Sequence, residues 1–281
     1  MKQIDELINF GSKNLKEKLI SSHQLDSELI LSNVLNKSRE KILTSLDQRV
    51  SKETILAFNQ LINRRAKKEP MAYIFKEKEF WSKNFLVNRA TLIPRPETEL
   101  LVERTLKYFR SKNPFILDVG TGSGCILLSF LKENNDSRGV GIDISKKVLN
   151  IAEKNSKTLN LVNRAKFYNK CITQVYGYKF DLVISNPPYI CSSQMKNLSE
   201  DIRKYEPRIA LNGGNDGLDV IRKVIYKSRS ILKKKGMLAL EIGNGQYKKV
   251  LKILNLNNFR NRFLVKDYRD NIRCIISTLE D

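Results

Sequence analysis

A short proline-rich segment follows a strongly apolar run in the second half of the chain. The apolar run 181–185 leads into Asn186-Pro-Pro-Tyr189. Two consecutive prolines fix φ and remove two backbone N–H donors, so Pro187 and Pro188 leave a stiff segment that offers carbonyl acceptors only. The side-chain oxygen of Asn186 and the carbonyl of Pro187 can accept both hydrogens of a planar NH2 group, while Tyr189 lies against its face. This arrangement suits group transfer to an amide or to a base amine, whose delocalised lone pair must be oriented.

A glycine-rich stretch forms a second candidate site. Asp118-Val-Gly-Thr-Gly-Ser-Gly124 joins a predicted strand to a helix expected to begin near Cys125. Glycines let the chain turn sharply and bring N–H groups close to a ligand beside a helix N-terminus. The spacing Gly-x-Gly-x-Gly differs from the pattern of dinucleotide enzymes. Asp143 ends the next strand about 20 residues later, where a carboxylate can accept both ribose hydroxyls. The loop and Asp143 together predict a nucleoside cofactor, although Asp143 can also cap a helix that starts at Lys146.

The sequence has few side chains for metal binding, disulfide formation or histidine-dependent reactions. There are one histidine, His23, and four cysteines that form no Cys-x-x-Cys pair, so we expect neither a zinc site nor a disulfide framework. A single imidazole also leaves little room for reactions that use histidine as nucleophile or base. We therefore expect a reaction that needs no metal and no histidine.

Alternating strands and helices position the two candidate sites. After Pro96 the pattern predicts a doubly wound α/β domain with a parallel sheet, and two final strands without a helix between them predict an antiparallel hairpin at one edge. Both motifs fall at carboxyl ends of strands, where open α/β sheets bind ligands. The predicted strands are 115–119, 140–144, 165–168, 181–185, 237–242, 263–266 and 272–279, and the clearest helices are 146–159 and 218–232.

The first part of the chain has a different pattern. Up to about residue 70, apolar residues recur at steps of three and four, which predicts a small helical bundle in which Ser51 caps the last long helix. A short hairpin with its turn at 82–84 is expected next. We predict three parts: a helical domain at 1–75, a linking β-hairpin at 76–92 and an α/β domain at 93–281.

The balance of charge is strongly basic, with 51 Lys and Arg against 30 Asp and Glu and a net charge of +21. Such a charge attracts nucleic acid or a ribosome-associated partner, but a compositional bias towards lysine explains it equally well. No stretch approaches the roughly 18 apolar residues of a membrane span, and the N-terminus lacks the pattern of a secretory signal. We expect a monomeric, cytoplasmic protein without a membrane partner.

Taken together, Asn186-Pro-Pro-Tyr189 and the glycine loop resemble the Asn-Pro-Pro-Tyr class of Rossmann-fold methyltransferases, which act on adenine, guanine or glutamine. Four further segments resemble the bacterial release factor glutamine methyltransferase family: 69–74, 92–99, 205–218 and 240–243. The resemblance implies a seven-stranded class I methyltransferase domain behind a small helical domain that grips the substrate. It further implies S-adenosylmethionine as cofactor, S-adenosylhomocysteine as product, and methylation of N5 of the glutamine in the Gly-Gly-Gln loop of peptide chain release factors.

The resemblance also implies roles for individual residues. Three are expected to be catalytic: Asn186, Pro187 and Tyr189. The expected cofactor-binding residues are Gly120, Thr121, Gly122, Ser123, Gly124, Asp143, Cys171 and Asn186. The expected substrate-binding residues are Asn186, Pro187, Pro188, Tyr189, Arg95 and Glu97, and Glu99 is expected near the same loop. The sequence departs from the family at Lys76, where a glycine is usual, and at Lys170-Cys171, where an acidic residue and a larger apolar residue are usual.

Two alternative functions stay open. A ribosomal-protein glutamine methyltransferase shares the fold and the reactive loop, although Pro94-Arg-Pro-Glu-Thr-Glu99 favours the release factor branch. A nucleic-acid amino-methyltransferase fits the positive charge, but it would need a recognition domain lined with basic and aromatic residues. Aromatic residues are few in the first 70 positions. A non-catalytic RNA-binding protein would be expected to lose the glycine loop or Asn186, and the chain keeps both.

Overall fold

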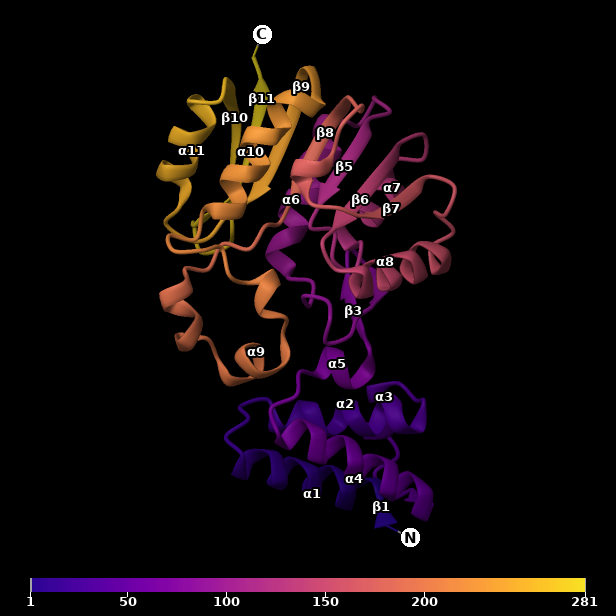
Figure 1. The fold of residues 1–281 in the computed structure, drawn as a ribbon. Coiled ribbons are helices and arrows are strands. Elements are labelled where there is room, and N and C mark those ends of the chain that lie inside the picture. Colours follow the sequence, from indigo (N-terminus) through magenta and orange to yellow (C-terminus); the bar gives the residue numbers. More distant parts are fainter. Residues whose placement is uncertain (1, 281) are drawn as a thin grey trace. The chain divides into compact units, whose positions relative to one another are not determined.

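The computed structural model describes residues 2–280, which divide into two units (Figure 1). The first unit runs to Lys76 and also includes the distant segment Glu200–Tyr205, and the second unit contains the remaining described residues. No helix among residues 2–280 is both long and apolar enough to cross a membrane.

The first unit is a bundle of helices, as the sequence predicted. Apolar side chains from its three long helices fill one core, and Ser51 accepts a hydrogen bond from Thr54 N to cap the last of them. A Cβ atom at Gly11 would lie 2.4 Å from Ser27 Oγ and 2.7 Å from Phe58 Cζ, so glycine permits the close helix packing. Its elements are β1 (Lys2–Gln3), α1 (Ile4–Glu17), α2 (His23–Leu35), α3 (Arg39–Leu43), β2 (Arg49–Val50), α4 (Lys52–Ala66), α5 (Met71–Phe75) and α9 (Glu200–Tyr205).

Lys76 ends helix α5 in a left-handed conformation, with φ of 63°. A side chain in this region costs about 1 kcal/mol relative to glycine. Glycine removes this cost from the folded state but gains entropy in the unfolded chain. We therefore expect Lys76→Gly to raise the free energy of unfolding by only about 0.5 kcal/mol. Urea denaturation measures the change. Lys78→Gly, in extended backbone, is the matched control and should lower stability; a lower stability for Lys76→Gly as well would contradict this explanation.

The second unit is built on a seven-stranded sheet with the order β10-β11-β9-β8-β5-β6-β7. Strands β5 to β9 run parallel, and β11 pairs antiparallel with both β9 and β10, so the predicted antiparallel hairpin at one edge is confirmed. The register of β10 against β11 shifts twice. The strands are β5 (Phe115–Val119), β6 (Arg138–Asp143), β7 (Ala165–Asn169), β8 (Phe180–Ser185), β9 (Leu232–Glu241), β10 (Phe259–Lys266) and β11 (Ile272–Leu279).

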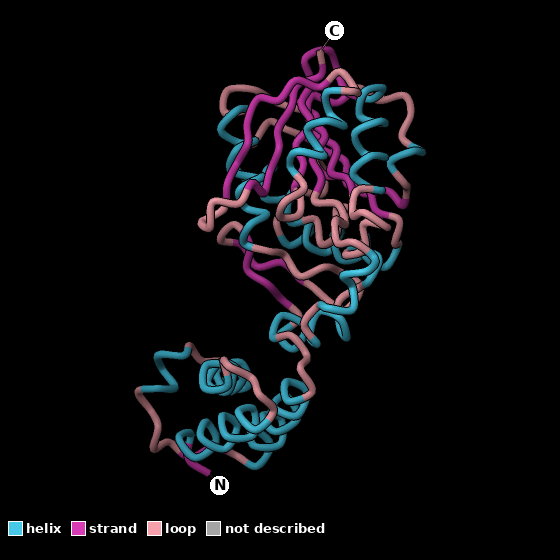
Figure 2. Tube along the Cα trace, turned by 90° about the vertical axis from the view of Figure 1, so that its left-hand side faces the viewer, coloured by secondary structure: helices cyan, strands magenta, loops and turns pink. Residues whose placement is uncertain are grey.

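Helices cover both faces of this sheet (Figure 2). Alternate strand residues point to opposite faces, so Leu117 and Val183 join one apolar core while Ile116 and Leu182 join the other. Helices α10 (Asp219–Ile231) and α11 (Tyr247–Asn255) pack on the first face, and α6 (Pro96–Tyr108) and α7 (Cys125–Glu133) on the second. Burial on both faces explains why the central strands read as continuous apolar runs. Helix α8 (Lys146–Thr158) packs beside β6 and β7.

A two-stranded hairpin precedes this domain, with β3 (Glu77–Phe80) paired to β4 (Lys83–Leu86). Its turn consists of Trp81 and Ser82, with φ of 53° and 52°, so the turn predicted at 82–84 was wrong. Two positive φ angles match the twist of the flanking strands, but this kind of turn is usually signalled by Asn-Gly. Trp-Ser gives no such signal. The carboxylate of Glu99 accepts a hydrogen bond from Trp81 N at 2.8 Å and holds the turn.

Candidate active site

The glycine loop lies between the end of β5 and the start of α7. Gly120, Gly122 and Gly124 all have positive φ, at 70°, 57° and 82°. A Cβ atom built on Gly120 would meet no atom within 4 Å, so its backbone borders open space. The N–H groups of Gly120 and Thr121 donate to the carbonyl of Ile142 at 2.9 and 3.0 Å, which fixes the loop against the end of β6. The loop therefore offers a rigid, open backbone surface.

Asp143 joins the end of β6 to this loop. Its Oδ2 accepts from Gly122 N at 3.2 Å and its Oδ1 from Ser145 N at 3.0 Å. Ser145, not Asp143, is the N-cap residue of α8, so the alternative role considered for Asp143 was wrong. Burial raises the pKa of Asp143, whereas the two N–H groups favour the charged form. Each oxygen keeps further lone pairs, so the carboxylate can still accept from a ligand.

Cys171 lies close to Asp143 along the neighbouring strand end. The preceding residue, Lys170, donates its N–H to the carbonyl of Asp143 at 3.1 Å. Cys171 is half-buried, and its N–H donates to Gln174 Oε1 at 2.9 Å. The structure therefore brings the Cys171 segment and Asp143 to one edge of the sheet.

Asp118 lies beneath the glycine loop and was not predicted as a site residue. Its side chain is fully buried, and its Oδ2 accepts from Thr121 Oγ1 at 2.7 Å. Its Oδ1 has no hydrogen-bond partner among residues 2–280. Burial raises the pKa of Asp118 to about 7. A carboxylate with an unused acceptor beneath the loop favours a positively charged group nearby. The signal in the sequence is a polar residue near the end of an otherwise apolar strand.

Asn155 of helix α8 supports the loop from the other side. Its side-chain nitrogen donates to Ser123 O at 2.8 Å and to Leu86 O at 3.1 Å, and its oxygen accepts from Leu86 N at 2.7 Å. This buried amide thus connects the glycine loop to strand β4 of the hairpin. No sequence motif pointed to it.

The reactive loop begins where β8 ends. Ser185 Oγ donates to Val119 O at 2.7 Å, which links the ends of β8 and β5 and so places Asn186 beside the glycine loop. The side-chain nitrogen of Asn186 donates to Thr98 Oγ1 at 3.0 Å. Within residues 2–280, neither Asn186 Oδ1 nor the carbonyl of Pro187 accepts a hydrogen bond. Asn186 is half-buried and Pro187 is buried, and both oxygens keep an unused acceptor.

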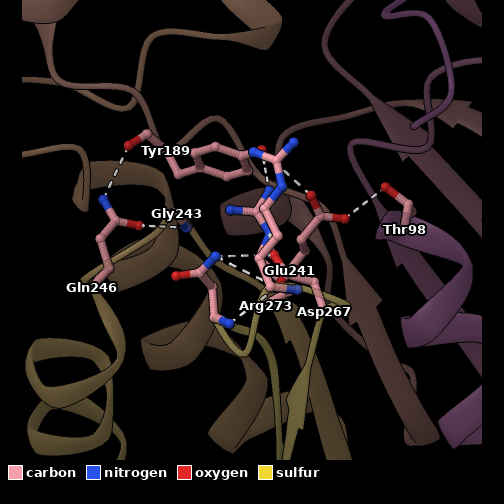
Figure 3. A network of polar contacts seen from close by, with 9 residues as sticks. Thr98, Tyr189, Glu241, Gly243, Gln246, Asp267 and Arg273 are labelled. Atoms are coloured by element: carbon pink, nitrogen blue, oxygen red, sulfur yellow. Dashed lines mark hydrogen bonds and ion pairs between the residues drawn. The ribbon is translucent and has the colours of Figure 1, made fainter. Parts of the chain in front are cut away.

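Tyr189 belongs to a network of polar contacts (Figure 3). Its hydroxyl oxygen lies 3.4 Å from Glu241 Oε1 and 3.4 Å from Arg273 Nη2, and the Arg273 guanidinium carbon is 5.8 Å from the ring centroid. Gln246 Nε2 donates to Tyr189 O at 3.0 Å. Burial raises the pKa of Tyr189 to about 12, so the phenol stays protonated near neutral pH. Tyr189 thus presents a fixed ring and does not act as a base.

Glu241 at the end of β9 completes this network. Only 1% of the residue is exposed, and its Oε2 accepts from Thr98 Oγ1 at 2.6 Å. Burial raises the pKa of Glu241 to about 7, while the Thr98 hydrogen bond and Arg273 oppose the rise. Thr98 and Glu241 lie in segments that resemble the family, yet no role was predicted for either.

A glycine-rich segment backs the reactive loop. Ile190 N donates to Leu211 O at 3.0 Å and Gly213 N to Ile190 O at 2.8 Å. A Cβ atom at Gly213 would lie 2.7 Å from Pro188 O, so the two backbones can approach only with glycine there. The segment 211–217 therefore packs against the backbone of Pro188 and Ile190 and stabilises the reactive loop.

Arg95 and Glu97 lie at the start of α6. The Arg95 guanidinium forms an ion pair of 2.5 Å with Glu206, whose side chain is 1% exposed. Arg95 keeps 31% of its own side chain exposed, so it can still meet a substrate. Glu97 is exposed, and its charge influences Glu241 and Arg273. Glu99, in contrast, directs its carboxylate to the hairpin turn.

Taken as a whole, the site offers two free acceptors and a fixed aromatic ring beside an open glycine loop. No group of three or more potential metal ligands occurs among the residues that the structure describes. Such a site can orient a planar NH2 group next to a nucleoside-containing ligand and stabilise positive charge on its nitrogen.

Comparisons with known proteins agree with this geometry. Residues 6–75 match the family model described as PrmC N-terminal domain, and residues 110–273 match a methyltransferase domain. The chain is 38% identical over 275 residues to a release factor glutamine methyltransferase of Buchnera aphidicola, covering 98% of each chain. It is 37% identical over 281 residues to that of Clostridium acetobutylicum, covering 99% of this chain and 98% of the relative. A methyltransferase structure from Pyrococcus furiosus shares the fold, with a TM-score of 0.55, 16% identity and coverage of 78% and 99%.

Proposed function

The chain belongs to the family of release factor glutamine methyltransferases, and we propose that it methylates N5 of the glutamine in the Gly-Gly-Gln loop of a peptide chain release factor. The observation that best supports the proposal is the hydrogen bonding of the Asn186 side chain. Its nitrogen is bound by Thr98 while its oxygen, like the carbonyl of Pro187, is free to accept. Two free acceptors next to a flat ring match the two N–H groups of a glutamine side chain.

The residues around the glycine loop fit S-adenosylmethionine. The space that a Cβ atom would fill at Gly120 is open, and Asp143 has lone pairs left for the ribose hydroxyls. The unused acceptor of Asp118 suits a ligand with an ammonium group and a sulfonium. Cys171 would lie near the adenine, because it follows two residues after Asn169, the neighbour of Asp143 on the adjoining strand. When bound, the cofactor supplies an electrophilic methyl group on positively charged sulfur.

The chain's part in the reaction is to hold and polarise the glutamine amide. Asn186 Oδ1 and the carbonyl of Pro187 accept its two N–H groups and aim the nitrogen at the methyl carbon. Positive charge would develop on the amide nitrogen as it takes up the methyl group, and the two oxygens would stabilise that charge. One N–H proton then leaves to solvent, which gives N5-methylglutamine and S-adenosylhomocysteine.

We propose that the helical unit binds the release factor. Its match to the PrmC N-terminal domain supports this assignment, and the similarity to release factor glutamine methyltransferases extends over this unit because it covers 98% of their length. The three-part division at 1–75, 76–92 and 93–281 remains our proposal for how the chain is organised.

Mass spectrometry of purified release factor tests the proposed function. After incubation with this protein and S-adenosylmethionine, we expect one added methyl group on the Gly-Gly-Gln glutamine. Release factor in which that glutamine is replaced by asparagine is the matched control and should stay unmodified, because the shorter side chain cannot reach the two acceptors. Methylation of ribosomal protein or of RNA in a parallel reaction, with none on release factor, would overturn the substrate and leave methyl transfer standing.

A further inference from the structure

Three side chains from distant parts of the sequence form one hydrogen-bonded chain behind the reactive loop. Asn186 Nδ2 donates to Thr98 Oγ1 at 3.0 Å, and Thr98 Oγ1 donates to Glu241 Oε2 at 2.6 Å (Figure 3 shows the Thr98–Glu241 part). The length of the second bond is typical of a hydroxyl that donates to a charged carboxylate. Thr98 is 2% exposed and Glu241 is 1% exposed, so water does not compete for these bonds.

The hydroxyl of Thr98 decides how the Asn186 amide is turned. A hydroxyl has one proton, and an ionised carboxylate can only accept. With Glu241 charged, Thr98 must donate its proton to Glu241 and can only accept from Asn186. The NH2 end of the Asn186 amide therefore faces Thr98, and its oxygen is left for the substrate.

We propose that Thr98 and the ionised carboxylate of Glu241 are positioning residues, which hold the Asn186 amide with its oxygen towards the methyl-accepting nitrogen. The proposal rests on the function proposed above, since it assumes that this oxygen accepts a substrate N–H. Both residues are buried, so we place neither in contact with the substrate or the cofactor. Both act through Asn186.

Protonation of Glu241 can reverse the direction of both hydrogen bonds between Asn186, Thr98 and Glu241. A neutral carboxyl can donate to Thr98, Thr98 can then donate to Asn186 Oδ1, and the amide turns its NH2 end outward. An NH2 group facing the NH2 of glutamine cannot accept from it. The rate of methyl transfer should therefore fall as Glu241 gains its proton. Because burial raises the pKa of Glu241 to about 7, we expect this fall near neutral pH.

Several charged or titratable groups act on Glu241 from the elements around it. Arg273 from β11 favours its ionised form, and the exposed Glu97 of α6 opposes it. The neighbouring Tyr189, Cys125 and Cys274 have pKa values raised by burial, to about 12 for Tyr189 and Cys125. These three stay neutral between pH 6 and pH 8, so they add no titration of their own there.

A nuclear magnetic resonance titration tests these hydrogen bonds without any methyl transfer. The side-chain 1H–15N signal of Asn186 is assigned by its absence from the Asn186→Ala variant. In the wild-type protein we expect this signal to shift with pH near pH 7, where both Glu241 and Asp118 titrate. In Glu241→Gln, which cannot ionise, the part of the shift due to Glu241 should be lost. A wild-type signal that does not respond to pH would overturn the proposal.

Rates of the first turnover, at saturating cofactor, give the second readout. We expect Thr98→Val to lower the rate about tenfold and Thr98→Ser, which keeps the hydroxyl, to restore most of it. Thr105→Val is the matched control, because Thr105 is equally buried on the same helix but donates to Leu101 O. Saturating cofactor is needed because Asp118, beneath the glycine loop, also has a pKa raised to about 7.

The pH profile separates positioning from a purely structural role. The wild-type rate should fall as pH decreases below about 7, whereas Glu241→Gln should be about tenfold slower at pH 8 and show no inflection from this group. An unchanged profile in Glu241→Gln would overturn the proposal. If the Asn186 signal titrates but release factor is not methylated, the proposed function fails and the positioning chain stands.

Discussion

Asn186→Ala is expected to slow methyl transfer about 100- to 1,000-fold, the usual effect of removing one preorganised polar contact to a transition state. The variant removes the free oxygen that accepts from the glutamine amide. It leaves the Thr98 hydroxyl bonded to Glu241, so no buried charge loses its partner. The measurement is the rate of a single turnover at saturating release factor and cofactor, with the melting temperature as a check on folding.

Asn150→Ala provides the matched control for this experiment. Asn150 is exposed on helix α8 and belongs to neither the reactive loop nor the glycine loop, so its replacement should leave the rate unchanged. A loss of less than about threefold in Asn186→Ala would be well below the effect of such contacts and would remove Asn186 from the catalytic residues.

The second large effect is expected on cofactor binding. Asp143→Asn should raise the dissociation constant for S-adenosylhomocysteine about 100-fold, because hydrogen bonds to a charged group contribute about 1.5 to 3 kcal/mol each. Asparagine has one acceptor oxygen, whereas Gly122 N and Ser145 N need two. The amide nitrogen would face one of these N–H groups, and the ribose hydroxyls would lose a charged acceptor. Isothermal titration calorimetry at pH 8 measures the constant.

The pH dependence of binding follows from the same carboxylate. Burial raises the pKa of Asp143, so the group takes up a proton at a higher pH than an exposed aspartate does. Affinity for S-adenosylhomocysteine should therefore decrease as pH falls through this raised pKa, and the part of the decrease due to Asp143 should vanish in Asp143→Asn. Asp136→Asn, at the exposed opposite end of β6, is the matched control. Equal affinity of the two variants would contradict the ribose-binding role.

The sequence predicted the sheet because burial on both faces leaves a clear signal. The run 181–185 lies within strand β8, and the run 237–242 matches the end of β9 except for its last residue, while the missing helix before 272–279 correctly indicated the antiparallel edge. Local chemistry also marked the candidate site, since glycines and prolines restrict the backbone in ways that can be read from a few residues. Asn186 and the glycine loop were identified in this way.

Interactions between distant residues left no comparable signal. Thr98 is separated from Asn186 by 88 positions and from Glu241 by 143, so nothing in a local pattern connects them. Strand topology brings them together. The same holds for Asn155, whose partners lie 32 and 69 residues away, and for Glu200–Tyr205, which joins the helical unit although the chain around it belongs to the other.

Conformations that are unusual for their residue type were also beyond prediction. Lys76, Trp81 and Ser82 all have positive φ, yet none of them is a residue that favours it. The surrounding structure imposes these angles through the ends of α5 and the hairpin.

The outer strand β10 affects how the protein behaves at high concentration. An edge strand exposes unpaired backbone groups that another chain can extend into an intermolecular sheet. Strand β10 carries Arg260, Arg262 and Lys266, and its register against β11 is interrupted twice. Repulsion between like charges and an irregular edge make β10 a poor template for a second copy. The basic side chains of β10 thus oppose aggregation of the folded protein through its sheet.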